Sequence, residues 1–242
     1  MGKKVLMIDG SSRKKNTYNI LLQMEQILKA KGFDVEILNL FDYNLLDCIG
    51  CEACVTKHTC SQTDDIQAVL DKILESDGVV LSSPVYMSSA TSRFKTFADR
   101  TNIWVHKPET AGMPMMFVTT TAATGIKEIK RFFNLYANGL GARKGGFIAR
   151  AGKKIADPIN EKEMSKFIGL LNRDKKYYRP AMDEIIMFVV GKILAKKSSG
   201  EDHTFWEEKQ WMDKGYYYPC RINIFKKGMG KFLSKVISKA MA

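Results

Sequence analysis

The chain has 242 residues, of which 45% are hydrophobic and 26% charged, a balance typical of a globular protein with a sizeable buried core. Its formal net charge is +12, and the basic excess is uneven: residues 1–150 hold 19 Lys/Arg against 15 Asp/Glu, whereas residues 151–242 hold 19 against 11. No helix-turn-helix, RNP or zinc-finger pattern accompanies this charge, which argues against nucleic acid as the partner. An acidic redox protein is the expected partner instead.

The first residues do not have the pattern of a secretory signal peptide. The stretch from Met1 to Gly10 turns polar too early for a signal peptide. The longest apolar run, Ile185 to Leu194, is interrupted by Gly191-Lys192 and is too short to span a bilayer. We therefore expect a cytoplasmic protein without a membrane span.

An apolar strand at residues 3–8 leads into a polar loop at residues 9–17, and an apolar face at helical spacing follows. Free backbone N–H groups and the helix dipole make the start of such a helix an anion site. The spacing fits neither a Walker loop nor a dinucleotide fingerprint. Hydroxyl groups together with Asn16 and Thr17 suit a single phosphomonoester, and a plain solvated loop is the alternative.

A second strand at residues 33–40 leads directly into a cysteine motif. Thiolates spaced C-x2-C-x2-C-x5-C can converge on one inorganic centre, and the tight run suits an iron–sulfur cluster. A zinc site that includes His58 is one alternative, and free or disulfide-bonded cysteines are another. Four of the five cysteines form this motif: Cys48, Cys51, Cys54 and Cys60.

Three more strands are expected at residues 78–82, 115–119 and 145–149, with helical patterns between them. This alternation predicts a doubly wound parallel sheet. The loop at residues 83–89 contains a proline and an aromatic side chain, which suits contact with a flat heteroaromatic ring. Loops at the carboxyl ends of parallel strands are where such sheets bind ligands. A turn that only positions the next helix is the alternative.

Residues 153–242 are expected to form a helical extension to a domain at residues 1–152. Segments 160–171 and 180–196 carry apolar faces at helical spacing. The segment from Arg221 to Ala242 combines six Lys/Arg with an apolar stripe and has no acid. We expect this stripe to pack on the body of the protein or on a sister subunit, with a membrane-surface helix as the alternative.

Three segments together resemble the iron–sulfur flavoproteins, which belong to the NADPH-dependent FMN reductase branch of the flavodoxin-like superfamily. They are the loop Gly10–Thr17, the segment Ser83–Arg100 and the motif Cys48–Cys60. The resemblance covers about residues 1–150. It implies an α/β, flavodoxin-like fold with a doubly wound five-stranded parallel sheet, and a homo-oligomer, dimer or tetramer, with flavin at the subunit contacts.

The resemblance also implies two cofactors and the residues that hold them. The FMN phosphate would be bound by Ser11, Arg13, Asn16 and Thr17. The isoalloxazine ring would be lined by Pro84, Val85, Tyr86, Met87 and Ser88, and its other edge by Thr120, Thr121, Ala122 and Gly125. A [4Fe–4S] cluster would be ligated by Cys48, Cys51, Cys54 and Cys60. The chain departs from the family pattern at Ser12, Lys15 and Ala122-Ala123.

The function that the resemblance implies is an oxidoreductase that relays electrons from a low-potential donor such as ferredoxin, through cluster and FMN, to an acceptor that the sequence does not identify. No catalytic side chain is expected, because the flavin carries the electrons. One alternative is an NAD(P)H-dependent FMN or quinone reductase with structural or zinc-binding cysteines. The other is a non-catalytic redox sensor or interaction module.

The second and third strands both end at the carboxyl edge of the predicted sheet, so cluster and flavin are expected to share that edge. The flavin beside the cluster would be the chain's own or that of a sister subunit. Cys220 lies far from the motif and has no assigned role.

Overall fold

The computed structural model describes residues 2–57, 59–198 and 200–240, and its strands form one parallel sheet. Across the sheet their order is β2-β1-β3-β4-β5, with every neighbouring pair parallel. This is the flavodoxin-like order, which confirms the predicted fold class. The strands in the described residues are β1 (Lys4–Asp9), β2 (Asp34–Asn39), β3 (Gly78–Ser82), β4 (Pro114–Thr121) and β5 (Arg143–Ala151).

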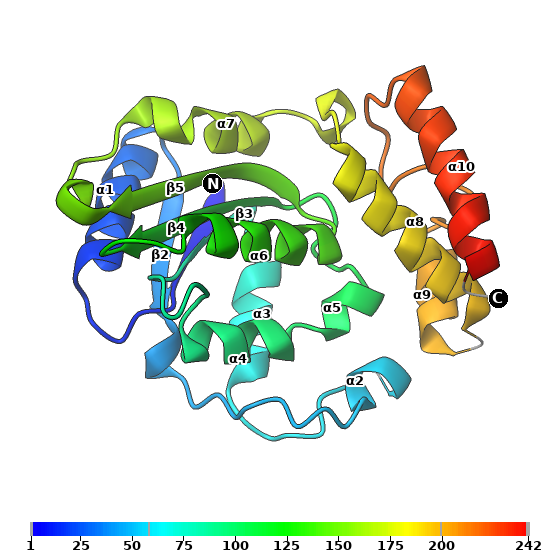
Figure 1. Cartoon of the computed structure of the whole chain (residues 1–242), viewed down its shortest axis with the longest axis horizontal. Coiled ribbons are helices and arrows are strands. Elements are labelled where there is room, and N and C mark those ends of the chain that lie inside the picture. The colour runs from blue at the N-terminus through cyan, green and yellow to red at the C-terminus, as the bar shows by residue number, and fades with distance from the viewer. Residues whose placement is uncertain (1, 58, 199, 241–242) are drawn as a thin grey trace.

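Helices cover both faces of the sheet (Figure 1). One face carries α1 (Asn16–Ala30) and α7 (Glu161–Asn172), and the other carries α3 (Ile66–Leu74), α4 (Ser92–Arg100) and α6 (Ile126–Gly139). Two single-turn helices, α2 (Ala53–Thr56) and α5 (Ile103–His106), lie near each other beyond α4. Short 3-10 turns occur at Leu40–Asp42, Gly152–Lys154 and Lys175–Tyr177.

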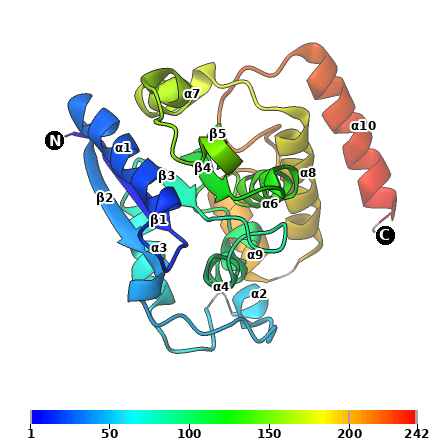
Figure 2. The ribbon, with the colours of Figure 1, turned by 60° about the vertical axis from the view of Figure 1, so that its left-hand side comes forward.

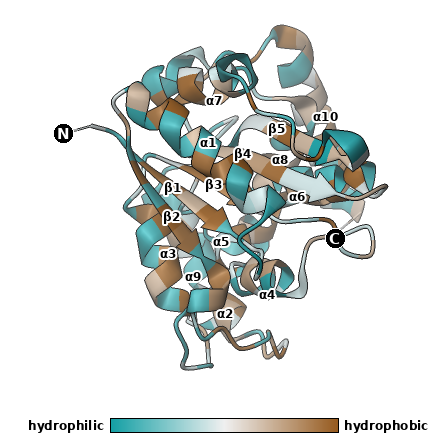
Figure 3. Cartoon of the chain, turned by 90° about the vertical axis from the view of Figure 1, so that its left-hand side faces the viewer, coloured by the Kyte–Doolittle hydropathy of each residue, from teal (hydrophilic) through white to brown (hydrophobic). Residues whose placement is uncertain are grey.

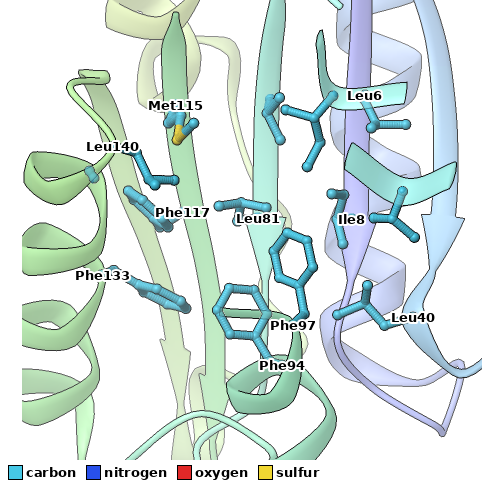
Figure 4. Close-up of a cluster of buried hydrophobic side chains, with 14 of the residues drawn as sticks. Leu6, Ile8, Leu40, Leu81, Phe94, Phe97, Met115, Phe117, Phe133 and Leu140 are labelled. Carbon is cyan, nitrogen blue, oxygen red and sulfur yellow. The ribbon is translucent and has the colours of Figure 1, made fainter. Parts of the chain in front are cut away.

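Aromatic side chains dominate the core on the face covered by α4 and α6 (Figure 4). Phe94 of α4 meets Phe133 of α6 edge-on at 5.4 Å between ring centroids, and Phe133 stacks on Phe117 of β4 at 4.7 Å. Such pairs contribute about 0.5–1.5 kcal/mol each beyond the area they bury. The central strands β3 and β4 are buried along their whole length, as expected for strands covered on both faces, and brown segments mark the apolar residues of the sheet (Figure 3).

The opposite face is closed by α1 and α7 together. Met24 and Leu28 of α1 belong to the same buried cluster as Met164 and Phe167 of α7. A Cβ atom at Gly145 of β5 would lie 2.7 Å from the Phe167 ring, so α7 packs directly on the strand backbone. Helix α7, which follows the domain boundary expected at residue 152, therefore packs on the sheet of the region before that boundary.

The remaining chain forms a third cluster beside the sheet. Helices α8 (Met182–Lys197), α9 (Glu201–Glu208) and α10 (Ile224–Ala240) surround an aromatic core built on Trp206 and Tyr217. Helix α10 lies against α8, which separates it from the sheet (Figure 2). Much of its apolar stripe faces solvent, and no described helix is long and apolar enough to cross a membrane.

Candidate functional site

The loop between β1 and α1 lies at the carboxyl edge of the sheet and is held by a buried hydrogen-bond network. The Ser11 N–H donates to Asp9 Oδ1 (3.1 Å), and the Ser11 hydroxyl donates to the Arg13 carbonyl (3.1 Å). The Asn39 amide, at the end of β2, donates to Asp9 Oδ2 (3.1 Å) and to the Ser11 carbonyl (2.9 Å). The loop backbone is therefore fixed before any ligand binds.

The amino end of α1 fits an anion. Its N-cap residue, Lys15, makes no side-chain capping bond, and the first turn carries no acidic residue. Arg13 and Lys14 precede it and add positive charge. Because uncapped N–H groups and the helix dipole favour negative charge, this end of the helix can hold a phosphate group. Thr17 ties the helix to β4 through a 2.6 Å hydroxyl contact with Thr120.

The loop between β3 and α4 forms a tight hairpin. Tyr86 and Ser89 exchange two backbone hydrogen bonds of 2.9 Å, and the residues between them, Met87 and Ser88, both have positive φ (47° and 62°). Non-glycine residues in this region store strain, which clusters at ligand sites. The Met87 side chain is 99% exposed, so this strained tip projects an apolar group into solvent.

Gly125 brings the third loop close to this hairpin. It precedes α6 with φ +90°, and a Cβ atom there would lie 2.5 Å from Val85 Cγ1 and 3.1 Å from Ser88 Cα. The Val85 N–H also donates to the Thr120 carbonyl (2.9 Å), which joins the hairpin to the end of β4. A larger residue at Gly125 would therefore push the two loops apart.

The three loops meet between β1 and β3, the point where the strand order reverses and where sheets of this order bind their ligand. Arg13 Nη2 donates to the Tyr86 hydroxyl (3.0 Å) and joins the first loop to the hairpin. These features fit FMN. The uncapped amino end of α1 and Arg13 suit its phosphate, and the close approach of the loops at Gly125 suits its flat ring. The loops carry every residue assigned to FMN from the sequence: Ser11, Arg13, Asn16, Thr17, Pro84, Val85, Tyr86, Met87, Ser88, Thr120, Thr121, Ala122 and Gly125.

Sequence reasoning did not assign Asp9 or Asn39 to the site. Asp9 is fully buried, and burial raises its pKa to about 6, although hydrogen bonds from Ser82 and Ser11 act in the opposite direction. The sequence did contain a signal for Asp9, because an acidic residue at the end of an otherwise apolar strand is unusual. Both side chains support the loop from beneath.

The cysteine loop begins at the end of β2, passes beneath α4 and reaches α5 (Figure 1). All four cysteines of the motif line one cavity of about 340 Å³. Cys54 is half-buried, and the other three are exposed. Gly50 and Glu52 have positive φ (65° and 58°), so the backbone between the cysteines turns sharply. The four cysteines that the spacing singled out therefore face a common cavity.

Polar groups surround the thiols. The Ser61 hydroxyl lies 3.0 Å from Cys51 Sγ. Hydrogen bonding from this hydroxyl and from the Ala53 N–H lowers the pKa of the Cys51 thiol. The Asn102 amide donates to Cys54 Sγ over 3.9 Å. Because the thiolate is the form that binds metal, a lowered thiol pKa favours ligation.

A buried ion pair lies against the same cavity. Arg100 makes a two-point contact with Asp64, at 2.6 and 2.9 Å, and also donates to the Leu46 carbonyl (2.6 Å). The two side chains are 1% and 0% exposed, and both residues line the cysteine cavity. Burial alone would lower the pKa of Arg100, but Asp64 and the Cys60 thiol outweigh it and raise that pKa. The sequence reasoning missed this pair.

The cavity fits a centre with soft thiolate ligands. Arg100 Nε is buried and has no hydrogen-bond partner among the described residues, which leaves a donor for a cluster sulfur in the cavity that Cys60 also lines. Among the described residues, no three Cys, His, Asp or Glu side chains already converge closely enough to hold a metal ion. The four thiols would therefore have to move closer together to ligate a cluster. His58, the alternative zinc ligand, lies outside the described residues, and all five cysteines are free thiols.

Within one chain the cysteine loop lies apart from the three flavin loops, so the expectation that it lies near a flavin now rests on the flavin of a sister subunit. The β1–α1 loop lies at the left of Figure 1, whereas α2, within the cysteine loop, lies at the lower right. The cysteine cavity has no lining residue in common with the three flavin loops. The reason is the path of the chain, because the long loop after β2 carries the cysteines past α4 before it turns back into α3.

Comparison with known proteins identifies similar sequences. A sequence model of the NADPH-dependent FMN reductases matches residues 3–143. A protein named iron–sulfur flavoprotein from Archaeoglobus fulgidus is 40% identical over 100 residues, an alignment that covers 41% of this chain but only about half (49%) of that protein. Another from the same organism is 28% identical over 85% of this chain and 98% of its own length. An iron–sulfur flavoprotein from Clostridioides difficile is 29% identical over 82% of this chain and 92% of its own length.

Solved structures share the fold at low sequence identity. A structure of RosB with a bound 8-demethyl-8-formylriboflavin-5'-phosphate intermediate superposes with a TM-score of 0.53 at 12% identity and covers 92% of both chains. A flavone reductase superposes with a TM-score of 0.51 at 16% identity, covering 84% of this chain and 69% of its own. At these identities the likeness concerns the fold alone.

Proposed function

Because the chain belongs to the NADPH-dependent FMN reductase family, we propose that it is a flavin-dependent oxidoreductase with two redox centres. FMN binds on the loops after β1, β3 and β4, and a [4Fe–4S] cluster binds in the cysteine cavity. Electrons pass from a low-potential donor such as ferredoxin, through cluster and FMN, to an acceptor. The likeness to iron–sulfur flavoproteins over 98% of one relative's length supports this proposal.

One observation carries the two-centre proposal: four thiols that line a single cavity beside a buried, incompletely bonded guanidinium. Four thiolates are the ligand set of a cubane cluster, and donors near the sulfur atoms raise its reduction potential. Cys48, Cys51, Cys54 and Cys60 are the proposed ligands.

The flavin loops would position the cofactor without acid–base chemistry. The amino end of α1, with Ser11, Arg13 and Thr17, holds the phosphate. The hairpin at residues 84–88 lies along the ring, and Gly125 lets the loop after β4 approach its other edge. Bound FMN supplies both one- and two-electron steps, which suits exchange with a one-electron cluster. The side chains bind and orient the ring and exclude water from it.

Electron transfer between the centres would require a homo-oligomer, because the cysteine cavity lies away from the chain's own flavin loops. Apolar side chains are exposed at both places: Ile49 on the cysteine loop is 67% exposed, and Tyr86 and Met87 project from the hairpin. Contact between the cysteine loop of one subunit and the hairpin of another would bury these groups and bring cluster and flavin together. Dimers and tetramers both permit this contact.

Anaerobically purified protein provides the test. We expect one FMN, four iron atoms and four acid-labile sulfides per chain, in a particle larger than a monomer by light scattering. Cys54→Ser should lose the iron and sulfide and keep FMN. Cys220→Ser is the matched control, because Cys220 lies outside the cavity and should lose neither. FMN-free protein that cannot be reconstituted would refute the flavin assignment, and iron that survives Cys54→Ser would refute the cysteine assignment.

A second function is favoured by one observation: the thiols do not yet converge in the structure. In that case the chain is an NAD(P)H-dependent FMN or quinone reductase whose cysteines are structural or bind zinc. Stoichiometric zinc without sulfide, together with turnover by NAD(P)H and none by reduced ferredoxin, identifies this reductase. Turnover with neither donor identifies a redox sensor.

A further inference from the structure

The largest cavity near the amino edge of the sheet holds an unusual number of arginines. It has a volume of about 810 Å³ and lies between α7, the segment that joins α7 to α8, and the first residues of β5. Small-molecule sites have volumes of about 300–1,000 Å³. Four of the nine arginines of the chain line it: Arg143, Arg173, Arg179 and Arg221. The flavin loops lie at the opposite edge of the sheet.

Arg143 is a buried cation without a carboxylate partner. Its side chain is at the base of the cavity and is only 4% exposed, and Nε donates to the Gly112 carbonyl (2.7 Å). Its two terminal nitrogens have no hydrogen-bond partner among the described residues. The Tyr178 ring lies 6.0 Å from the guanidinium carbon, and Asp174 attracts the charge without forming an ion pair with it in the described part of the chain. Burial lowers the pKa of Arg143, because the charged form loses its hydration there. A guanidinium with free donors in the wall of a cavity suits an anionic ligand.

The other arginines of the cavity are also unpaired. Arg173 and Arg179 are exposed and form no ion pair in the described part of the chain, and Arg221 stacks on the Tyr177 ring at 5.0 Å. By contrast, Arg100 and Arg150 each have a carboxylate partner elsewhere in the fold. The guanidinium groups of this cavity are therefore available to a ligand.

Both acidic side chains of the cavity, Asp174 and Glu184, and one of its two lysines, Lys144, already have partners. Glu184 is buried and accepts hydrogen bonds from the Tyr178 hydroxyl (2.6 Å) and the Ala181 N–H (2.6 Å). Asp174 pairs with Lys176 (3.2 Å), and Lys144 pairs with Asp183 outside the cavity (2.6 Å). Asp174 also attracts Arg143, but two carboxylates face four arginines and two lysines, so the cavity keeps an excess of positive charge.

We propose that this cavity binds a small, multiply charged oxyanion of the phosphate or polycarboxylate class, at a site separate from the flavin. Guanidinium forks match the paired oxygens of both groups, and Arg143 supplies a pre-desolvated anchor at the base. Two or more negative charges are needed to satisfy several guanidinium groups at once. The ligand would contact Arg143 on β5 and also Arg173 and Arg179 on the segment between α7 and α8.

The test is calorimetric titration of FMN-loaded protein with pyrophosphate at low salt, where bound FMN already occupies the phosphate site at α1. We expect one pyrophosphate per chain. Arg173→Met and Arg179→Met change exposed residues and should preserve the fold, and each should weaken binding about tenfold. Arg143→Met should abolish binding. Arg131→Met is the control, because it removes the same charge from an exposed position on α6 and should leave the affinity unchanged.

The outcomes separate the ligand classes and the alternatives. Citrate that binds as tightly as pyrophosphate supports a site that recognises charge, and selective binding of pyrophosphate supports a phosphate site. Absence of a one-to-one heat signal overturns the proposal. An equal loss of affinity in Arg131→Met and Arg173→Met also overturns it, because the binding then depends only on net charge. FMN content, measured by absorbance in every variant, confirms that the flavin site is intact.

Discussion

Replacement of Asp64 by Asn should destabilise the protein by about 3–5 kcal/mol, the usual cost of removing one partner from a buried ion pair. The Arg100 guanidinium would stay charged in a site where both side chains are almost completely buried. Two charges about 4 Å apart attract by about 4 kcal/mol at an effective dielectric constant of 20, which agrees with this range. An Asn side chain would also turn an N–H₂ group toward a donor of Arg100.

Urea unfolding of the cluster-free protein, followed by far-UV circular dichroism, measures this loss. Asp99→Asn is the matched control, because Asp99 adjoins Arg100 on α4 but forms an exposed pair with Lys95, and it should change stability by less than about 1 kcal/mol. The double variant Asp64→Leu/Arg100→Met should recover most of the loss, since no isolated charge remains buried. Equal effects of Asp64→Asn and Asp99→Asn would refute the reasoning.

Two further predictions concern the flavin loops. Because burial raises the pKa of Asp9 to about 6, the folded state keeps a proton that the unfolded state releases near pH 4. The FMN-free protein should therefore lose roughly 3 kcal/mol of stability, relative to Asp9→Asn, as the pH rises from about 4 to about 6 in urea titrations; a flat difference would contradict this. Gly125→Ala should weaken FMN binding at least about tenfold in fluorescence titrations, because its Cβ would overlap Val85 in a strained φ region. Gly169→Ala, on α7 with open space around it, should leave that affinity unchanged, and equal affinities in both variants would show that the loop approach does not matter.

The central strands β1, β3 and β4 could be predicted from the sequence because nearly all of their residues are buried. Residues 5–8 and 78–82, for example, form short apolar runs between turn residues, and nothing else in the chain competes for them. The flavin loops followed from the same pattern, since each comes directly after a strand. Asp9 was missed because an acid after a strand reads as a loop residue, whereas its burial depends on Asn39 and Ser82 from other strands.

The surroundings of the cysteines could be predicted only in part. Sequence spacing identified the four thiols, because they are close along the chain. Asp64 lies just before α3, which begins at Ile66, and pairs with Arg100, 36 residues away. A local pattern cannot reveal such a long-range partner, nor the route by which the loop passes α4.

The C-terminal third shows the same limit. The helical spacing at residues 160–171 was correct, but it could not reveal that Phe167 packs on the sheet beside α1. The apolar stripe of α10 was expected to be covered, yet Phe225 and Phe232 are 74% and 62% exposed in the single chain. Amphipathic periodicity predicts a helix and its apolar face, whereas the partner of that face depends on the tertiary arrangement.

The aromatic cluster beside the sheet gives the chain a fluorescence signal, from tryptophan, that is separate from the emission of bound flavin. Two of the chain's three tryptophans, Trp206 on α9 and Trp211 just after it, are buried in the aromatic cluster beside α8, and Trp206 Nε1 donates to the His106 carbonyl at 2.9 Å. Tryptophan emission is therefore weighted toward the C-terminal helices, whereas the emission of bound flavin depends on loops at the far edge of the sheet. When both signals are recorded in one denaturation experiment, coincident transitions mean that the helices and the sheet unfold as one cooperative unit. Separate transitions assign a stability to each.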